Sequence, residues 1–285
     1  MAGIGKPMKR TQYIGSGDVA SFIDWFARKV GDQSVRHSYV DRRTQRRVVF
    51  DGLCSALDQY RWNGKSYDQN ADDLDKLRSG LAKAMKIEDR KERDKSVCAS
   101  CVEVMEWGRV APRNKKWLFD NEDGLASTIA NVCGILRSED DDLSSFPVNM
   151  RFNAGMTKIY SLLVSAFIIY DSRVAAALGW FVVQWLRELD DPTLPEPLSF
   201  PWMPAKEAPN AGNPKKRDPS CGPYNFPRVN GSAAHARWNL RASWILAEAL
   251  RKSKEACFYQ KGDPLRWSYP DSVDGVGLRK SASAE

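Results

Sequence analysis

Asn153-Ala-Gly-Met-Thr-Lys158 opens the stretch that decides the fold. The stretch continues as an apolar run to Ile169 and ends in Tyr170-Asp171-Ser172-Arg173-Val174. It predicts two consecutive apolar helices, the first with Lys158 near its start and the second with Asp171 just before it. An aspartate that caps a helix N-terminus is held by backbone N–H groups and favoured in its ionised form. Asp171 is therefore a candidate acid, base or electrostatic stabiliser, although an ordinary helix cap looks the same and is commoner.

Length and charge indicate a globular protein with a basic surface. The chain has 285 residues, of which 42% are hydrophobic, which is enough for one large domain or two modest ones. Forty-three Lys and Arg residues against 36 Asp and Glu residues give a net charge of +7. This charge favours a polyanionic partner, most often nucleic acid, and the alternative is that it serves solubility alone.

The hydropathy pattern predicts a cytoplasmic protein. We see no apolar segment typical of a secretory signal in the first residues, and Asp171, Arg173 and Gln184 interrupt the longest apolar stretch, near 159–185. Six cysteines are scattered along the chain, and in a reducing compartment we expect most of them to be thiols of the core.

Helical periodicity dominates and predicts an all-α fold. We expect an N-terminal arm over 1–15, a two-lobed helical domain over 16–259 and a C-terminal tail over 260–285. The β-prone run Val48-Val49-Phe50 fits a buried helix equally well. The acidic run 138–142 is expected to be a solvated loop, with a metal site as the minor alternative. The expected helices lie at about 16–26, 46–60, 72–85, 95–107, 123–136, 155–167, 171–189 and 232–253.

A Pro-rich segment over 191–232 precedes the last of these helices. Its ten prolines forbid regular helix, so we expect a long irregular insertion. Such insertions in compact domains are usually functional or disordered.

The helix expected at about 155–167 begins with groups that could bind an anion or attack a carbonyl-like carbon. Gly155 and Thr157 can begin a helix whose free backbone N–H groups bind phosphate. The helix dipole disfavours a cation in the first turn, and a lysine that has lost its proton can act as a nucleophile. The number of residues between Lys158 and Asp171 does not by itself imply that the two side chains lie close together. The alternative is that Lys158 lies on the surface and Asp171 is only a cap.

Thr157-Lys158-Ile159 followed by Ile169-Tyr170-Asp171-Ser172-Arg173-Val174 resembles the core of the helix–hairpin–helix DNA glycosylase superfamily. The similarity is closer to bacterial 8-oxoguanine-glycosylase-like proteins and to Brig-type glycosylases, which excise modified bases from phage DNA. The resemblance implies that Asp171 is the catalytic aspartate and that Lys158 takes the place of the Schiff-base lysine of bifunctional members. The chain departs from the pattern in having one hairpin glycine, Gly155, and a shorter interval between lysine and aspartate.

The resemblance implies a monomeric enzyme that flips a modified base out of double-stranded DNA and cleaves its N-glycosidic bond. An ionised carboxylate stabilises the positive charge that develops on the sugar, or activates water. We expect a monofunctional enzyme because the lysine spacing is altered. We favour glucosylated hydroxymethylcytosine of phage DNA, because the segment 191–232 could line an enlarged pocket. The alternatives are oxidised guanine as the substrate, or a non-catalytic DNA-binding protein of the same fold.

Other side chains are candidates for the DNA interface and the base pocket. Trp180 and Trp238 could stack on a flipped base, and the alternative is that both belong to the core. Cys98-Ala-Ser-Cys101 lacks a second pair at ligand spacing, so we expect no metal and no cofactor. The basic candidates for DNA contact, each with solvated surface as the alternative, are Arg173, the cluster Arg113, Lys115 and Lys116, and the cluster Lys215, Lys216 and Arg217.

Overall fold

The computed structural model describes residues 7–41, 45–147, 150–207 and 215–254. This part of the chain is mostly helical and has one two-stranded antiparallel sheet. The expected tail over 260–285 lies outside it. The elements are α1 Arg10–Ile14, α2 Gly17–Gly31, β1 Arg36–Val40, β2 Arg47–Asp51, α3 Leu53–Asp58, α4 Tyr67–Ala84, α5 Arg90–Trp107, α6 Ala111–Asp120, α7 Leu125–Arg137, α8 Met156–Leu163, α9 Ser172–Glu188, the 3₁₀ helix η1 Glu196–Leu198 and α10 Ser232–Ser253.

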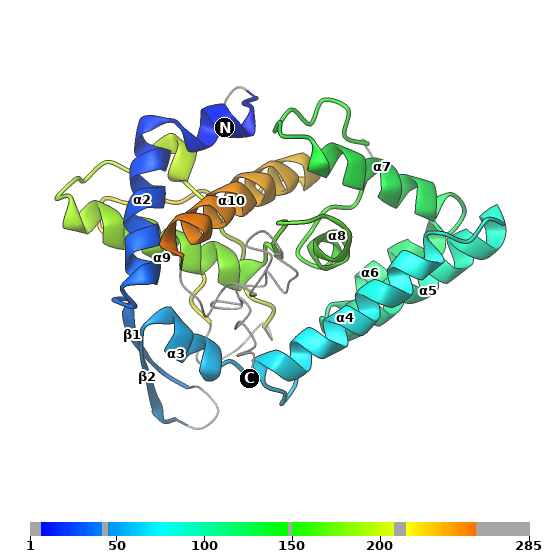
Figure 1. Ribbon diagram of the computed structural model, residues 1–285, viewed down its shortest axis with the longest axis horizontal. Coiled ribbons are helices and arrows are strands. Elements are labelled where there is room, and N and C mark those ends of the chain that lie inside the picture. The colour runs from blue at the N-terminus through cyan, green and yellow to red at the C-terminus, as the bar shows by residue number, and fades with distance from the viewer. Residues whose placement is uncertain (1–6, 42–44, 148–149, 208–214, 255–285) are drawn as a thin grey trace.

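The described helices form two lobes (Figure 1). In the first lobe, α10 packs along α2, and α1 and α9 also contact this pair. In the second lobe, α5 packs against α4, α6 and α7. Helix α8 contacts α4 and α5, and a short link, residues 164–170, then leads to α9 in the first lobe. Two helices that are adjacent in sequence therefore belong to different lobes.

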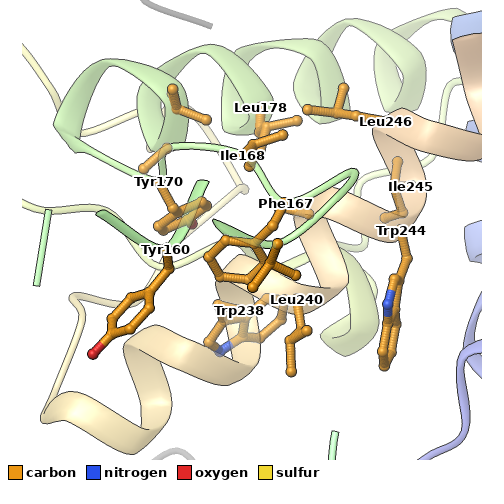
Figure 2. Packing of buried hydrophobic residues seen from close by; sticks show 14 of the residues in the cluster. Tyr160, Phe167, Ile168, Tyr170, Leu178, Trp238, Leu240, Trp244, Ile245 and Leu246 are labelled. Carbon is orange, nitrogen blue, oxygen red and sulfur yellow. The ribbon is translucent and has the colours of Figure 1, made fainter. Parts of the chain in front are cut away.

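Helix α10 runs through the centre of the first lobe. Between Ala234 and Ala247 every residue is buried except Arg237, as expected of a helix that is covered on all sides. Figure 2 shows its Trp238 near Phe167 of the link. The bounds that the sequence predicts for this helix are confirmed.

Polar side chains of α10 fix the link that precedes Asp171. The amide of Asn239 donates to the Ile168 carbonyl at 2.8 Å, and the Ile168 N–H donates to the hydroxyl of Ser243 at 3.1 Å. These bonds satisfy backbone groups that are buried away from water. The path of the chain into α9 is thus set by a helix from the far end of the sequence.

A buried ion pair joins the acidic run to α10. Asp141 Oδ2 lies 2.6 Å from Arg241 Nε, and neither side chain is more than 3% exposed. The Met8 N–H donates to the other carboxylate oxygen of Asp141 at 2.6 Å. The prediction of a wholly solvated acidic loop is therefore wrong for Asp141, because a buried arginine compensates its charge. Helix α1 likewise packs on α10, so the expected N-terminal arm is partly core.

The prediction of one helix over 46–60 is wrong. Residues 47–51 form β2, which pairs antiparallel with β1, and only Leu53–Asp58 is helical. The β-branched pair Val48 and Val49 favours the strand. Gly52, at φ +84°, then turns the chain into α3. Helix α6 was not predicted from the sequence.

None of the described helices combines the length and the apolarity that a membrane span requires.

Candidate functional site

A pocket of about 770 Å³ is lined by the N-terminal ends of α8 and α9 and by residues from both lobes. Among the described residues that line it, Asp171 is the only acid. The basic side chains that line it are Arg109, Arg151, Lys158, Arg173, Lys206, Lys215 and Arg217. The pocket is therefore strongly positive around one carboxylate.

Asp171 is the N-cap of α9, as the sequence predicts. Its Oδ1 accepts from the backbone N–H groups of Arg173 at 2.8 Å and Val174 at 3.2 Å. Its Oδ2 lies 3.8 Å from Arg173 Nη1. Because the backbone holds Oδ1, Oδ2 is the oxygen that remains for a reacting group. The side chain is 14% exposed, so the carboxylate is largely shielded from bulk water.

The charge of Asp171 is maintained by its neighbours. Burial by itself raises the pKa of the Asp171 carboxyl. The positive charges of Lys158 and Arg173, together with the two backbone N–H donors, outweigh burial and hold the pKa below its usual value. Asp171 is therefore an ionised carboxylate at neutral pH, and it can stabilise a cation or accept a proton from water.

Lys158 lies in the same pocket as Asp171, although the sequence left their proximity open. Its side chain is 5% exposed, and Nζ donates to the Ala154 carbonyl at 3.2 Å. Gly108, at the end of α5, is packed against the aliphatic stem of Lys158. The reading of Lys158 as a surface residue is thus wrong, and the structure brings the lysine and the aspartate together from two lobes.

The start of α8 is closed by Asn153. Its Oδ1 accepts from the N–H groups of Gly155 at 2.8 Å and Met156 at 3.1 Å. Thr157 is fully buried, and its hydroxyl donates to the Ala154 carbonyl at 3.1 Å. Gly155 lines the pocket, but the prediction that Gly155 and Thr157 offer free groups to a phosphate is wrong, because an internal cap already uses them.

Asn114 of α6 supports this cap, and the sequence analysis missed it. Its Oδ1 accepts from Arg151 Nε at 2.7 Å and from the Asn153 amide at 3.0 Å. Its own amide donates to the Val110 carbonyl at 3.0 Å. Asn114 is 6% exposed. Asparagine has low helix propensity, so a buried asparagine inside a helix indicates that its side chain supports other residues. This signal could be recognised only after α6 was known to be a helix.

The pocket holds a different tryptophan from the two that were predicted. Trp180 packs against His37 of β1, with ring centres 5.2 Å apart, and Trp238 packs against Phe200 at 5.6 Å. Neither of these described residues lines the pocket, so both predictions for the base pocket are wrong. Trp62, which follows α3, lines it instead.

His235 of α10 lines the pocket beside Asp171. Burial is the main cause that lowers the pKa of His235 to about 4, so the ring is neutral at physiological pH. Its Nε2 lies 2.8 Å from the Tyr170 carbonyl. Because a carbonyl only accepts, Nε2 carries the proton and Nδ1 is the unprotonated nitrogen.

The structure separates the two basic clusters. Lys215 and Arg217 line the pocket with Arg173, and Lys216 is exposed nearby in sequence. Arg113, Lys115 and Lys116 lie on α6 outside the pocket lining. There, Lys115 is 2.7 Å from a Glu106 oxygen and Lys116 is 2.9 Å from an Asp120 oxygen, while Arg113 is exposed.

Within the described residues, no group of three or more His, Cys, Asp or Glu side chains is arranged to hold a metal ion. Cys98, Cys101 and Cys133 are buried thiols, and burial raises the pKa of each.

Comparisons of the chain with protein-family models, curated proteins and solved structures found no match. The pocket itself is therefore the basis for a functional proposal.

Proposed function

We propose that the protein is a DNA glycosylase of helix–hairpin–helix type that removes a modified base from double-stranded DNA. The observation that carries the proposal is one ionised, backbone-held carboxylate in a pocket whose other charged lining residues are basic. Basic side chains attract and position the phosphates of DNA. A single carboxylate among them suits a reaction in which positive charge develops on the sugar.

The proposed reaction uses Oδ2 of Asp171. The bond between C1′ and the base nitrogen breaks, and its electron pair leaves with the base. The negative charge of Asp171 stabilises the positive charge on the deoxyribose, and the oxygen of a water molecule then bonds to C1′. Asp171 accepts a proton from that water, and the departing base takes up a proton from solvent. In the protein without DNA, Lys158 and Arg173 keep the carboxylate ionised.

We propose a monofunctional enzyme. Lys158 Nζ donates to the Ala154 carbonyl at 3.2 Å, and the interval between Lys158 and Asp171 is shorter than in the typical member of the family that the chain resembles. Borohydride added during turnover should therefore trap no covalent complex between protein and DNA. A trapped complex that disappears in Lys158→Gln would instead make the enzyme bifunctional.

The proposed substrate is a bulky phage-type cytosine, glucosylated hydroxymethylcytosine, excised in the cytoplasm as antiviral defence. The Pro-rich segment supports this choice because Met203, Lys206, Lys215, Arg217 and Val229 all line the pocket. The pocket volume of about 770 Å³ lies in the upper part of the range of pockets that hold drug-sized ligands. This volume is larger than an unmodified base needs.

Mass spectrometry of the bases released from duplexes with glucosylated hydroxymethylcytosine, 8-oxoguanine or unmodified bases tests the proposal. Wild type should release the glucosylated base, and Asp171→Asn should release none. Asparagine caps helices as well as aspartate does, so this variant should keep its fold and its affinity for DNA. Base release by Asp171→Asn would contradict the mechanism. Release of 8-oxoguanine alone would make oxidised guanine the substrate in place of glucosylated hydroxymethylcytosine. Binding without any release by wild type would favour a non-catalytic DNA-binding protein.

A further inference from the structure

Trp62 presents a firmly held indole ring to the pocket. The stretch Trp62-Asn63-Gly64-Lys65 forms a tight turn in which the Trp62 N–H donates to the Lys65 carbonyl at 3.0 Å and the reverse bond is 2.9 Å long. Asn63 and Gly64 have φ angles of +53° and +80°, which an Asn-Gly pair adopts at low cost. The backbone that carries the ring is therefore rigid.

Two further contacts fix this turn and the ring. The indole N–H of Trp62 donates to the Trp107 carbonyl at 3.2 Å. The fully buried Asn70 donates to the carbonyls of Trp62 at 3.1 Å, Lys65 at 3.2 Å and Ser66 at 2.8 Å. The ring is thus anchored through its edge, while Trp62 itself is only half-buried and lines the pocket.

The guanidinium of Arg173 links this ring to Asp171. Its central carbon lies 4.7 Å from the centre of the Trp62 ring, and its Nη1 lies 3.8 Å from Asp171 Oδ2. A planar group on this part of the indole is therefore adjacent to the reactive carboxylate oxygen. Guanidinium groups and nucleobases are both planar and both stack on aromatic rings, so a place that suits one suits the other.

We infer that Trp62 is the stacking surface for the extrahelical base, and that the base takes the place on the ring that the Arg173 guanidinium occupies in the structure. The side chain of Arg173 is 35% exposed, so it can turn from the ring to a DNA phosphate. The ligand class is a planar heteroaromatic base, and the rest of the pocket holds its substituent. This inference rests on the proposed function, because it places the base beside the carboxylate that cleaves its bond.

Binding measurements in the Asp171→Asn background test the inference without base release. Two duplexes are compared, one with the substrate base and one with a tetrahydrofuran abasic analogue at the same position. Trp62→Leu should weaken binding of the first by about 5- to 150-fold, the range for loss of one base–aromatic stack, and leave the second unchanged. Trp62→Phe should restore most of the difference. The matched control is Trp180→Leu, a half-buried tryptophan outside the pocket lining.

Fluorescence of 2-aminopurine at the target position gives a readout that a purely structural role would not change. Stacking on an indole keeps this probe quenched after it leaves the duplex, so wild type should show low emission and Trp62→Leu high emission. High emission with wild type would overturn the inference even if Trp62→Leu fails to fold. Equal losses of affinity for both duplexes in Trp62→Leu would also overturn it. If wild type with Asp171 intact releases no base from any duplex, the proposed function fails instead, whatever the probe shows.

Discussion

The aliphatic stem of Lys158 lies directly over Gly108. A Cβ atom on Gly108 would lie 2.5 Å from Lys158 Cδ and 2.6 Å from Lys158 Cε. Gly108 has φ −75°, which any residue adopts, so glycine is needed here for space and not for backbone conformation. The missing side chain at the end of α5 lets the lysine enter the pocket that contains Asp171.

Gly108→Ala should displace Lys158 and leave the fold intact, because the group that must give way is a flexible side chain. With the ammonium further away, the pKa of Asp171 rises from its lowered value. The acidic limb of the pH profile of base release should then move to higher pH. Gly80→Ala is the control, since a Cβ there meets nothing within 4 Å. Identical profiles for the two variants would show that Lys158 does not set the ionisation of Asp171.

Asn114→Ala should destabilise the protein and slow base release. It removes the acceptor for the half-buried side chains of Arg151 and Asn153, and each donor that is left without a partner costs up to about 1–3 kcal/mol. We expect a loss of about 2–4 kcal/mol in the free energy of unfolding, measured by urea denaturation. Asn121→Ala removes one exposed bond to Trp117 at the end of the same helix and should cost less than about 1 kcal/mol. Similar losses for the two variants would rule out a buried support at Asn114.

Stability should fall between pH 6.5 and pH 4 because of His235. Its pKa is lowered from 6.5 to about 4, so in this window the unfolded chain binds a proton that the folded protein does not. The free energy of unfolding is therefore highest above pH 6.5 and decreases by up to about 3 kcal/mol as the pH falls through the window. His235→Gln should remove most of this slope, whereas His37→Gln should retain most of it, although burial lowers the pKa of His37 as well. An unchanged slope in His235→Gln would refute the assignment.

The buried pair of Asp141 and Arg241 should be costly to break. Arg241→Met leaves an uncompensated buried carboxylate and should lower the free energy of unfolding by about 3–5 kcal/mol. The double variant Asp141→Leu/Arg241→Met should lose less than the sum of the single changes, because it leaves no lone buried charge. Lys116→Met, which breaks an exposed pair, should cost less than about 1 kcal/mol. Additive losses in thermal and chemical denaturation would contradict a compensated buried pair.

Local sequence signals predicted the elements that carry strong patterns. The bounds of α10 follow from its apolar residues, and Asp171 marks the start of α9 as a cap. Periodicity failed for 46–60, where a short run of β-branched residues pairs with a strand that the sequence did not reveal. It also missed α6, which is only ten residues long, although Pro112 in its first turn is a start signal.

The sequence predicted which residues could be catalytic, but it did not predict which residues share a pocket with them. Asp171 and Lys158 stand out in the sequence, but their sharing of a pocket depends on the packing of α8 against α4 and α5. Trp62 and Gly108 come from segments far from Asp171 in the chain, so no local spacing could single them out. Trp180 and Trp238 stood out by their positions on apolar helices, and for that reason they pack among other side chains.

The placement of Lys158 on α8 and of Asp171 at the start of α9 makes the charge of the aspartate depend on how the two helices are arranged. Because the charge of Lys158 lowers the pKa of Asp171, any change in the distance between the two side chains would change the proton affinity of Asp171. Under the proposed function, a bound DNA that increased this separation would make the Asp171 carboxylate easier to neutralise, and one that kept it short would leave the carboxylate charged. The protonation state of a single side chain would then depend on the arrangement of α8 relative to α9.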